Sequence, residues 1–236
     1  MISDLRGEVA AVCVGRIGEL DSSGRAIASA FVKRAVEGRA RLHSLGVEGD
    51  EHAYGGHGGE DGAVLVYSRD HYPFWRELGV DIPDAGAFAE NLTVEGLTEA
   101  EVHIGDTFEV GSCTVQVTEP RSPCYKIAAR YGRKDISIVV QETGFTGYLM
   151  RVLREGDVVA GDEMRLVERD TSHDCTVAEA GRIVNVDRND LDGARRLLRI
   201  GALSAAIKRT LAARIARGEK LGPDLDRLYL SGQVET

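Results

Sequence analysis

The sequence predicts an α+β protein, mainly β, in which a barrel of short strands is followed by a small group of helices. Glycine is abundant, with 28 residues against 5 prolines, and the glycines separate short β-like runs. These runs do not alternate with long helices, which favours a closed or nearly closed barrel over a parallel sheet with crossovers. After about residue 168 the apolar pattern changes to helical periods.

Short alternating or apolar runs mark the strands. The clearest are residues 107–110 and 113–118, which flank the turn Gly111-Ser112 and predict a β-hairpin. The other strand candidates are residues 9–17, 40–45, 63–67, 147–153 and 164–167.

Two helices are predicted between the strands. Residues 69–78 follow Ser68, a plausible N-cap, and carry large apolar residues at helical spacing. Residues 135–143 begin at Asp135 as the cap and stop at Gly144. We expect both helices to be packing elements.

The C-terminal part begins after a polar linker, residues 168–173. Thr176 and Glu179 have the spacing of a capping box. Two further runs have helical periods and end near glycines: residues 191–200 and 203–215. We therefore divide the chain into a barrel domain, residues 1–170, and a domain of about three short helices with a tail, residues 174–236.

Composition limits the possible functions. The net charge is −9 with a pI near 5.2, and nucleic acids and anionic membranes both require basic faces. No apolar run approaches the ~20 residues that span a bilayer, and the N-terminus lacks the apolar core of a signal peptide. The four cysteines are far apart, as in a reduced protein. We expect a cytoplasmic protein that binds neither nucleic acid nor membranes.

The segment from Pro120 to Lys126 is the most informative in the chain. Its two prolines stiffen the backbone on both sides of Arg121 and bring Cys124 to the start of a helix-like run. Two nearby cations should stabilise the thiolate form of Cys124. Residues 118–134 hold five cations and one acid, which indicates a pocket for an anion. The alternative is an ordinary buried or exposed cysteine in a turn. Cys13 and Cys113 lie in apolar alternating runs, and we interpret them as small core residues.

A glycine-rich loop, residues 49–62, is the second unusual segment. Its glycines let backbone amides approach a ligand closely, but no Gly-Lys-Ser/Thr ending makes it a P-loop. His52 and His57 with Asp50 could bind a metal, although the further ligands that zinc requires are missing. We favour His57 as a donor to an anion or as an orienting partner of the loop.

Residues 86–94 form a third segment, with Glu90 and Asn91 at the start of a strand. The amide of Asn91 can donate and accept, which suits a polar heterocycle. The alternative is a turn in which Asn91 bonds its own backbone. Lys33 alone would be interpreted as a solvated charge.

Taken together, these segments resemble the MOSC domain, named for its occurrence at the C-terminus of molybdenum-cofactor sulfurase, and in particular its YiiM-like branch. The trailing helices resemble the three-helix domain of that branch. The matching segments occur in family order over nearly the whole chain: residues 29–33, 49–50, 57–59, 71–75, 86–93, 105–106, 120–126 and 161–162.

The resemblance implies a MOSC β-barrel that binds molybdenum cofactor, a molybdopterin. Catalytic relatives reduce N-hydroxylated compounds, and the YiiM-like branch is associated with base analogues such as 6-hydroxylaminopurine. The family's molybdenum-ligating cysteine matches Cys124, and a thiolate is a suitable soft ligand. The expected enzyme is a molybdenum oxidoreductase with Cys124 as its catalytic residue.

The resemblance also suggests roles for the remaining polar residues. Arg121, Lys126 and Lys33 would bind the cofactor's phosphate and its negative dithiolene unit. Asn91 and Thr93 would contact the pterin, while His57 would close over the phosphate.

One position departs from the family pattern. Relatives usually show Gly-x-Phe-Gly-Glu-Asn, and this chain has Ala89 in place of the second glycine. If that position requires a positive φ, alanine costs about 1 kcal/mol and shifts Asn91.

Electrons must come from elsewhere, because the sequence has no flavin, haem or iron–sulfur motif. A separate reductase, expected to be a flavoprotein, is therefore the predicted partner. Three alternatives stay open: a non-catalytic carrier of the cofactor or of sulfur, a thiol enzyme that uses Cys124 without molybdenum, and a pyridoxal phosphate protein, for which no residue pattern speaks. The helices could dock the reductase, cover the pocket or form a homodimer.

Overall fold

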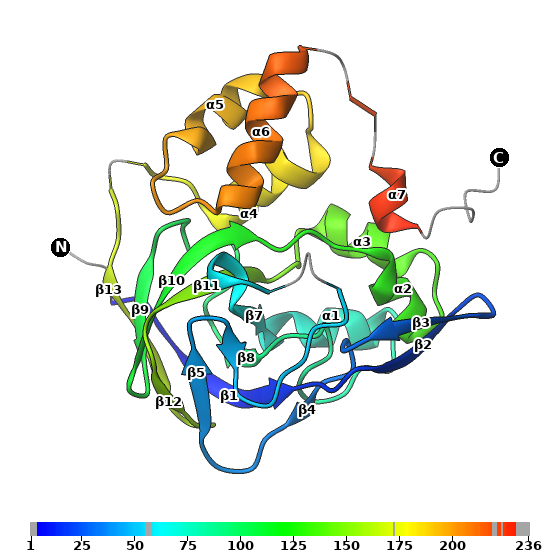
Figure 1. Cartoon of the computed structure of the whole chain (residues 1–236), viewed down its shortest axis with the longest axis vertical. Coiled ribbons are helices and arrows are strands. Elements are labelled where there is room, and N and C mark those ends of the chain that lie inside the picture. The colour runs from blue at the N-terminus through cyan, green and yellow to red at the C-terminus, as the bar shows by residue number, and fades with distance from the viewer. Residues whose placement is uncertain (1–3, 55–57, 172, 219–220, 223, 230–236) are drawn as a thin grey trace.

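The structure is a computed structural model that describes residues 4–54, 58–171, 173–218, 221–222 and 224–229. Its centre is a closed β-barrel of seven strands, with helices on two sides (Figure 1). The neighbours around the barrel run in the order β1, β13, β9, β10, β11, β7 and β8, and β8 pairs again with β1. The barrel strands are β1 (Arg6–Val14), β7 (Val64–Ser68), β8 (Leu92–Glu95), β9 (Thr107–Val110), β10 (Cys113–Pro120), β11 (Tyr148–Arg154) and β13 (Glu163–Glu168).

The predicted barrel is confirmed, and the pairing explains how it closes. The β1–β13 pair is antiparallel, with Arg6 opposite Arg165, and joins the first strand of the chain to the last. Full closure removes the exposed sheet edges that would invite aggregation. Among the described strands the parallel pair is β7–β8, where Val66 lies opposite Leu92, and α1 (Tyr72–Glu77) lies in the connection between them.

The hairpin is confirmed with its predicted turn, because Cys113 pairs with Val110 across Gly111-Ser112. Another hairpin was not predicted: β2 (Gly18–Ser22) and β3 (Arg25–Ser29) are joined at Ser23-Gly24, where both φ angles are positive. Positive φ at both turn residues is typical of the tight hairpins that suit strand twist. Four short strands lie beside the barrel or at its edge: β4 (Arg34–Ala35), β5 (Ala40–His43), β6 (Gly46–Val47) and β12 (Gly156–Val158).

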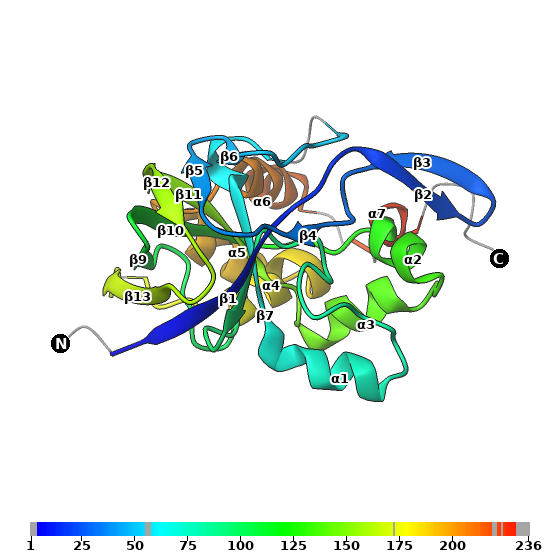
Figure 2. The ribbon, with the colours of Figure 1, turned by 90° about the horizontal axis from the view of Figure 1, so that it is seen from below.

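Helices α1, α2 (Tyr125–Tyr131) and α3 (Ile136–Thr143) cover one side of the barrel (Figure 2). Their apolar side chains form a second core around Trp75, whose indole N–H donates to the hydroxyl of Tyr67 on β7 at 2.7 Å. Ser68 accepts from Asp70 N, as expected of a cap. Asp135 is the N-cap residue of α3, as predicted, but its side chain makes no capping hydrogen bond and pairs with Arg133 instead.

The C-terminal helices lie across another side of the barrel, except for the last one, which lies beside α2 and α3 (Figure 1). They are α4 (Val177–Gly181), a π-helical turn (Arg182–Val186), α5 (Leu191–Leu198), α6 (Ala205–Arg217) and α7 (Leu225–Leu228). Thr176 caps α4 by accepting from Glu179 N at 3.1 Å. The apolar residues of α4 to α6 belong to the same buried cluster as the barrel interior, so the helices and the barrel share one core.

None of the helices in the described ranges has the length and apolar character needed to cross a bilayer.

Candidate functional site

The loop after β10 carries the candidate cysteine. Pro120 ends the strand, and Cys124 has an extended conformation immediately before α2. Cys124 is partly exposed, whereas the other three cysteines are buried. The fold therefore presents one thiol to ligands and uses the others as core residues, as the sequence predicts for Cys13 and Cys113.

Arg121 is a buried cation beside this thiol. Its side chain is 8% exposed, and its Nη1 has no hydrogen-bond partner among the described residues. Burial lowers the pKa of Arg121, while the nearby Cys124 and the carboxylate of Glu90 favour its charged form. A buried donor without a partner costs about 1–3 kcal/mol or more when charged. An anion that accepted from Nη1 would remove this cost.

Lys126 adds a second cation to the same segment. It lies in the first turn of α2 and is 8% exposed. No hydrogen bond or ion pair joins its side chain to another described residue. Arg121 and Lys126, the two cations that flank Cys124 in sequence, are thus both largely buried, and neither has an ion-pair partner among the described residues.

Lys33 lies in a different environment. It forms an ion pair with Asp50, and the two side chains are 7% and 2% exposed. Burial lowers the pKa of Lys33, and Asp50 opposes that change. Asp50 also accepts from Gly15 N at 2.7 Å and from the amide of Asn91 at 2.8 Å. The Lys33–Asp50 pair is therefore hydrogen-bonded to neighbouring protein groups.

Asn91 is engaged by three protein groups. Its amide nitrogen donates to Asp50 and to the carbonyl of Cys13 at 3.3 Å, and its oxygen accepts from Leu65 N at 3.1 Å. It thereby ties β8 to β1 and β7. Asn91 and Lys33 share Asp50 as a partner, so the amide of Asn91 already has protein partners.

Thr93 belongs to a neighbouring network centred on Glu90, a residue to which the sequence reasoning gave no role. The carboxylate of Glu90 is fully buried and accepts from the hydroxyls of Thr93 at 2.9 Å and Tyr72 at 2.5 Å. Phe88 N donates to its other oxygen at 2.7 Å. Since Glu90 acts electrostatically on both Lys33 and Arg121, it connects the two groups of cations. An acidic residue adjoining Asn91 in an apolar stretch was the available signal.

Ala89, which precedes this carboxylate, has φ of +67°. The position does require the left-handed conformation, so the sequence-based concern about alanine is confirmed. The amide of Asn91 nevertheless reaches Asp50.

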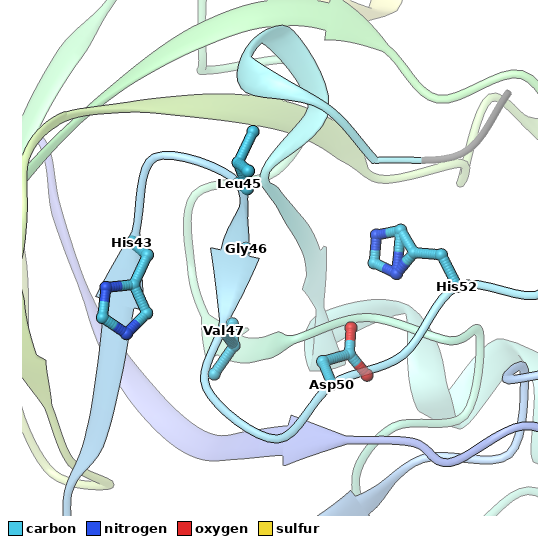
Figure 3. A pocket seen from close by; sticks show the side chains of 6 residues that line it. All are labelled: His43, Leu45, Gly46, Val47, Asp50 and His52. Carbon is cyan, nitrogen blue, oxygen red and sulfur yellow. The ribbon is translucent and has the colours of Figure 1, made fainter. Parts of the chain in front are cut away.

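A pocket of about 320 Å³ adjoins Asp50. Figure 3 shows Asp50 and His52 together on the segment that follows β6, with His43 on β5 across the pocket. Gly58 lies against the ring of His52, where an added Cβ would come within 2.3 Å of the imidazole. His57 lies outside the described residues. Among the residues that are described, no three histidines, cysteines or acids gather as a metal site.

A second pocket, of about 330 Å³, lies beside Tyr125, the residue that follows Cys124. It lies between the β2–β3 hairpin, α2 and α7. Its lining includes Ser22, Ser23, Tyr125, Ala129, Leu228 and Tyr229. The pocket brings solvent-accessible space next to the cysteine loop.

Comparison with known proteins assigns this architecture to a protein family. A model of the MOSC domain matches residues 53–165, and a model of the YiiM-like 3-alpha helix domain matches residues 176–218. Protein YiiM of Escherichia coli is 41% identical over 195 residues, which cover 81% of this chain and 86% of YiiM. This chain belongs to the MOSC domain family, in its YiiM-like branch. The predicted family and fold are therefore confirmed.

Other relatives extend the comparison. The crystal structure of YiiM from Escherichia coli superposes with a TM-score of 0.75 and 34% identity, covering 95% of this chain and 99% of that one. Uncharacterized protein YflK of Bacillus subtilis is 40% identical over 84% of this chain and 90% of its own length. A protein of Gibberella moniliformis named Reductase is 38% identical over 69% of this chain, a match that spans 30% of that protein.

Proposed function

We propose that this protein binds molybdenum cofactor at Cys124 and reduces small N-hydroxylated compounds, such as base analogues of the 6-hydroxylaminopurine type. The proposal rests chiefly on one observation: the buried Arg121, whose Nη1 has no partner within the described part of the chain, lies beside the partly exposed Cys124. The MOSC family membership and the fungal relative named Reductase support it.

The donor set fits the cofactor. The thiolate of Cys124 would be a soft ligand for molybdenum. Arg121 and Lys126 would donate to the negative oxygens and dithiolene sulfurs, since charge-assisted hydrogen bonds are the strong ones. Lys33, Asn91 and Thr93 would contact the cofactor from the Asp50 and Glu90 networks, and His57 is proposed to donate to the phosphate.

When bound, the cofactor supplies two-electron oxygen chemistry at its metal. The protein's own part is to hold and orient. The loop would fix the direction of Cys124, and Arg121 would provide positive charge from a largely buried position. The pocket of about 330 Å³ lined by Tyr125, the residue that follows Cys124, has the size of a small-ligand site. We propose that the substrate enters there.

The electrons are proposed to come from a separate reductase of the flavoprotein type. The four cysteines lie at positions 13, 113, 124 and 175, a spacing without the clusters that bind iron–sulfur centres.

The test is expression in a host that makes molybdenum cofactor, followed by molybdenum and pterin analysis. We expect one molybdenum per chain and reduction of a hydroxylaminopurine with a chemical or flavoprotein donor. Cys124→Ala should lose both, whereas Cys175→Ala, which removes a buried thiol, should keep both. Retained turnover in Cys124→Ala would refute the proposal. Bound molybdenum without reduction by any donor would instead favour a carrier.

A further inference from the structure

The four residues that lead into the site are each held by a different part of the chain. Arg121 N donates at 3.1 Å to the carbonyl of Gly147, the residue immediately before β11. The hydroxyl of Ser122 donates to Asn185 at 2.7 Å, and the carbonyl of Cys124 accepts from the hydroxyl of Ser137 at 3.0 Å. The fourth residue, Pro123, is held from the C-terminal segment.

Arg227 of α7 makes that contact. Its Nη1 donates to the carbonyl of Pro123, and its Nη2 donates to Gln141 on α3 at 2.6 Å. Nε lies 3.7 Å from Asp224, and the side chain is 19% exposed. Both views show α7 next to α2 and α3 (Figures 1 and 2). One planar guanidinium thus bridges the loop and the helix that supports it.

The Pro123 carbonyl is an effective point of control. It belongs to the peptide group that also contains the nitrogen of Cys124, and the peptide is planar. Fixing that plane fixes the backbone from which the Cys124 side chain projects. Proline has no N–H through which the loop could be held at this residue, so the carbonyl is its one backbone hydrogen-bonding group.

Asn185 holds the two residues that precede Pro123 in the loop, Arg121 and Ser122. Its oxygen accepts from Ser122, and its amide nitrogen donates to the carbonyl of Arg121 at 3.4 Å. Asn185 is buried in the π-helical turn, where Arg214 of α6 donates to the carbonyls of Ile183 and Val184. π-helical turns occur often at functional sites. In this π-helical turn, the side-chain amide of Asn185 contacts the cysteine loop.

We propose that Arg227 and Asn185 are positioning residues that hold the Cys124 loop in its ligating conformation, so that the C-terminal helical region is part of the site. The inference builds on the proposed role of Cys124. Arg227 lies beyond both ranges matched by the family models, residues 53–165 and 176–218. The region's contribution is to fix direction at the loop; contact with substrate is not required.

The first test uses amide hydrogen exchange of the full chain without cofactor. In Arg227→Gln, peptides that cover residues 122–131 should exchange at least tenfold faster, while peptides from β9 and β13 keep the wild-type rate. Arg209→Gln, an exposed cation on α6, is the control and should change nothing. Wild-type exchange of the loop in Arg227→Gln would overturn the proposal.

Two further variants separate positioning from charge and from general stability. Arg227→Lys keeps the charge but loses the planar fork, so it should exchange like Arg227→Gln; full rescue by lysine would overturn the positioning role. Ser122→Ala removes the bond to Asn185 from the loop side without altering the helices. It should reproduce the effect of Asn185→Ala, and a loop that is unchanged in Ser122→Ala would contradict the role of Asn185.

The loaded protein gives the functional readout. Molybdenum retention and kcat should fall about tenfold in Arg227→Gln, because the loop no longer holds Cys124 in its ligating conformation. Because exchange is measured without cofactor, the two proposals fail separately. A loop that responds in a protein that never binds molybdenum would refute the proposed function alone. A wild-type enzyme that binds molybdenum, with an Arg227→Gln variant equal to it in all readouts, would refute the positioning role alone.

Discussion

Two buried cations of this protein have opposite surroundings. Lys33 is ion-paired with Asp50, and the same carboxylate is bonded by Gly15 and Asn91. Arg121 is equally buried, yet its Nη1 has no partner among the described residues. Burial lowers the pKa of both side chains, but an acid in direct contact offsets the effect at Lys33 alone.

The difference separates architecture from binding. A buried charge is tolerated when it is paired and hydrogen-bonded. The Lys33–Asp50 pair meets that condition inside the protein and so stabilises the junction of β1 and β8. Arg121 does not meet it with described protein groups, which is the condition expected of a site that completes its bonding with an anionic ligand.

The largest expected effect on stability comes from removing Asp50, the counter-ion of the buried Lys33. Asp50→Ala leaves Lys33 buried without its counter-ion and should lower the free energy of unfolding by about 3–5 kcal/mol. Urea denaturation measures this. Asp84→Ala removes the acid of the exposed pair with Arg76 and serves as the matched control, with little expected change. If Asp50→Ala were as stable as the control, the two cations would not differ as described.

Replacing Arg121, the buried cation whose Nη1 is unpaired among the described residues, should not lower the stability of the protein. Arg121→Met removes a costly buried charge, so the free energy of unfolding should stay constant or rise. Cofactor affinity should fall by about 10- to 100-fold, since a charge-assisted hydrogen bond is worth about 1.5–3 kcal/mol. Molybdenum retention after gel filtration, with Arg209→Met as control, measures the loss. Strong destabilisation with full retention would make Arg121 a structural residue.

Alkylation of the cysteines tests whether the thiol of Cys124 is accessible to solvent. Burial raises the pKa of Cys13 and Cys175 to about 12 and that of Cys113 to about 11. Because the thiolate is the reactive form, these three should stay unlabelled in the folded protein as pH rises from 7 to 9. Iodoacetamide and mass spectrometry should find one label, at Cys124, and four after denaturation. Labelling of a second cysteine in the native state would contradict the assignment.

The smallest effect concerns Ala89, which adjoins the Glu90 and Asn91 networks. Its φ of +67° is costly for alanine, so Ala89→Gly should raise the free energy of unfolding by up to about 1 kcal/mol. Gly144→Ala is the mirror experiment, because Gly144 has φ of +74° and an added Cβ meets no atom. It should lose a similar amount in thermal or urea unfolding. A loss of stability in Ala89→Gly would show that the position is not strained.

Much of the fold could be predicted from local sequence. Period-two alternation, glycine turns and helix caps marked most barrel strands, the 107–118 hairpin and the helices after residue 176. The hairpin of β2 and β3 escaped prediction because its strands are polar and short, although its Ser23-Gly24 turn was a usable signal.

The site could be predicted in part. Cys124, Arg121 and Lys126 are neighbours in sequence, so their grouping follows from the chain itself. Charge pairing does not follow in this way: the sequence alone predicted Lys33 as a solvated charge, whereas the structure buries it in an ion pair with Asp50. The pairing depends on how the loop after β6 meets the segment after β3.

The sequence by itself determined the family, the strand and helix periods and a thiol set among cations, because each is written in adjacent residues or in ordered motifs. Only the tertiary structure decided which buried charges are satisfied and which helices hold the cysteine loop. Arg227 and Pro123 are 104 positions apart. Contacts of that separation exist only after the barrel has closed and the C-terminal helices have packed on it, and no local pattern encodes them.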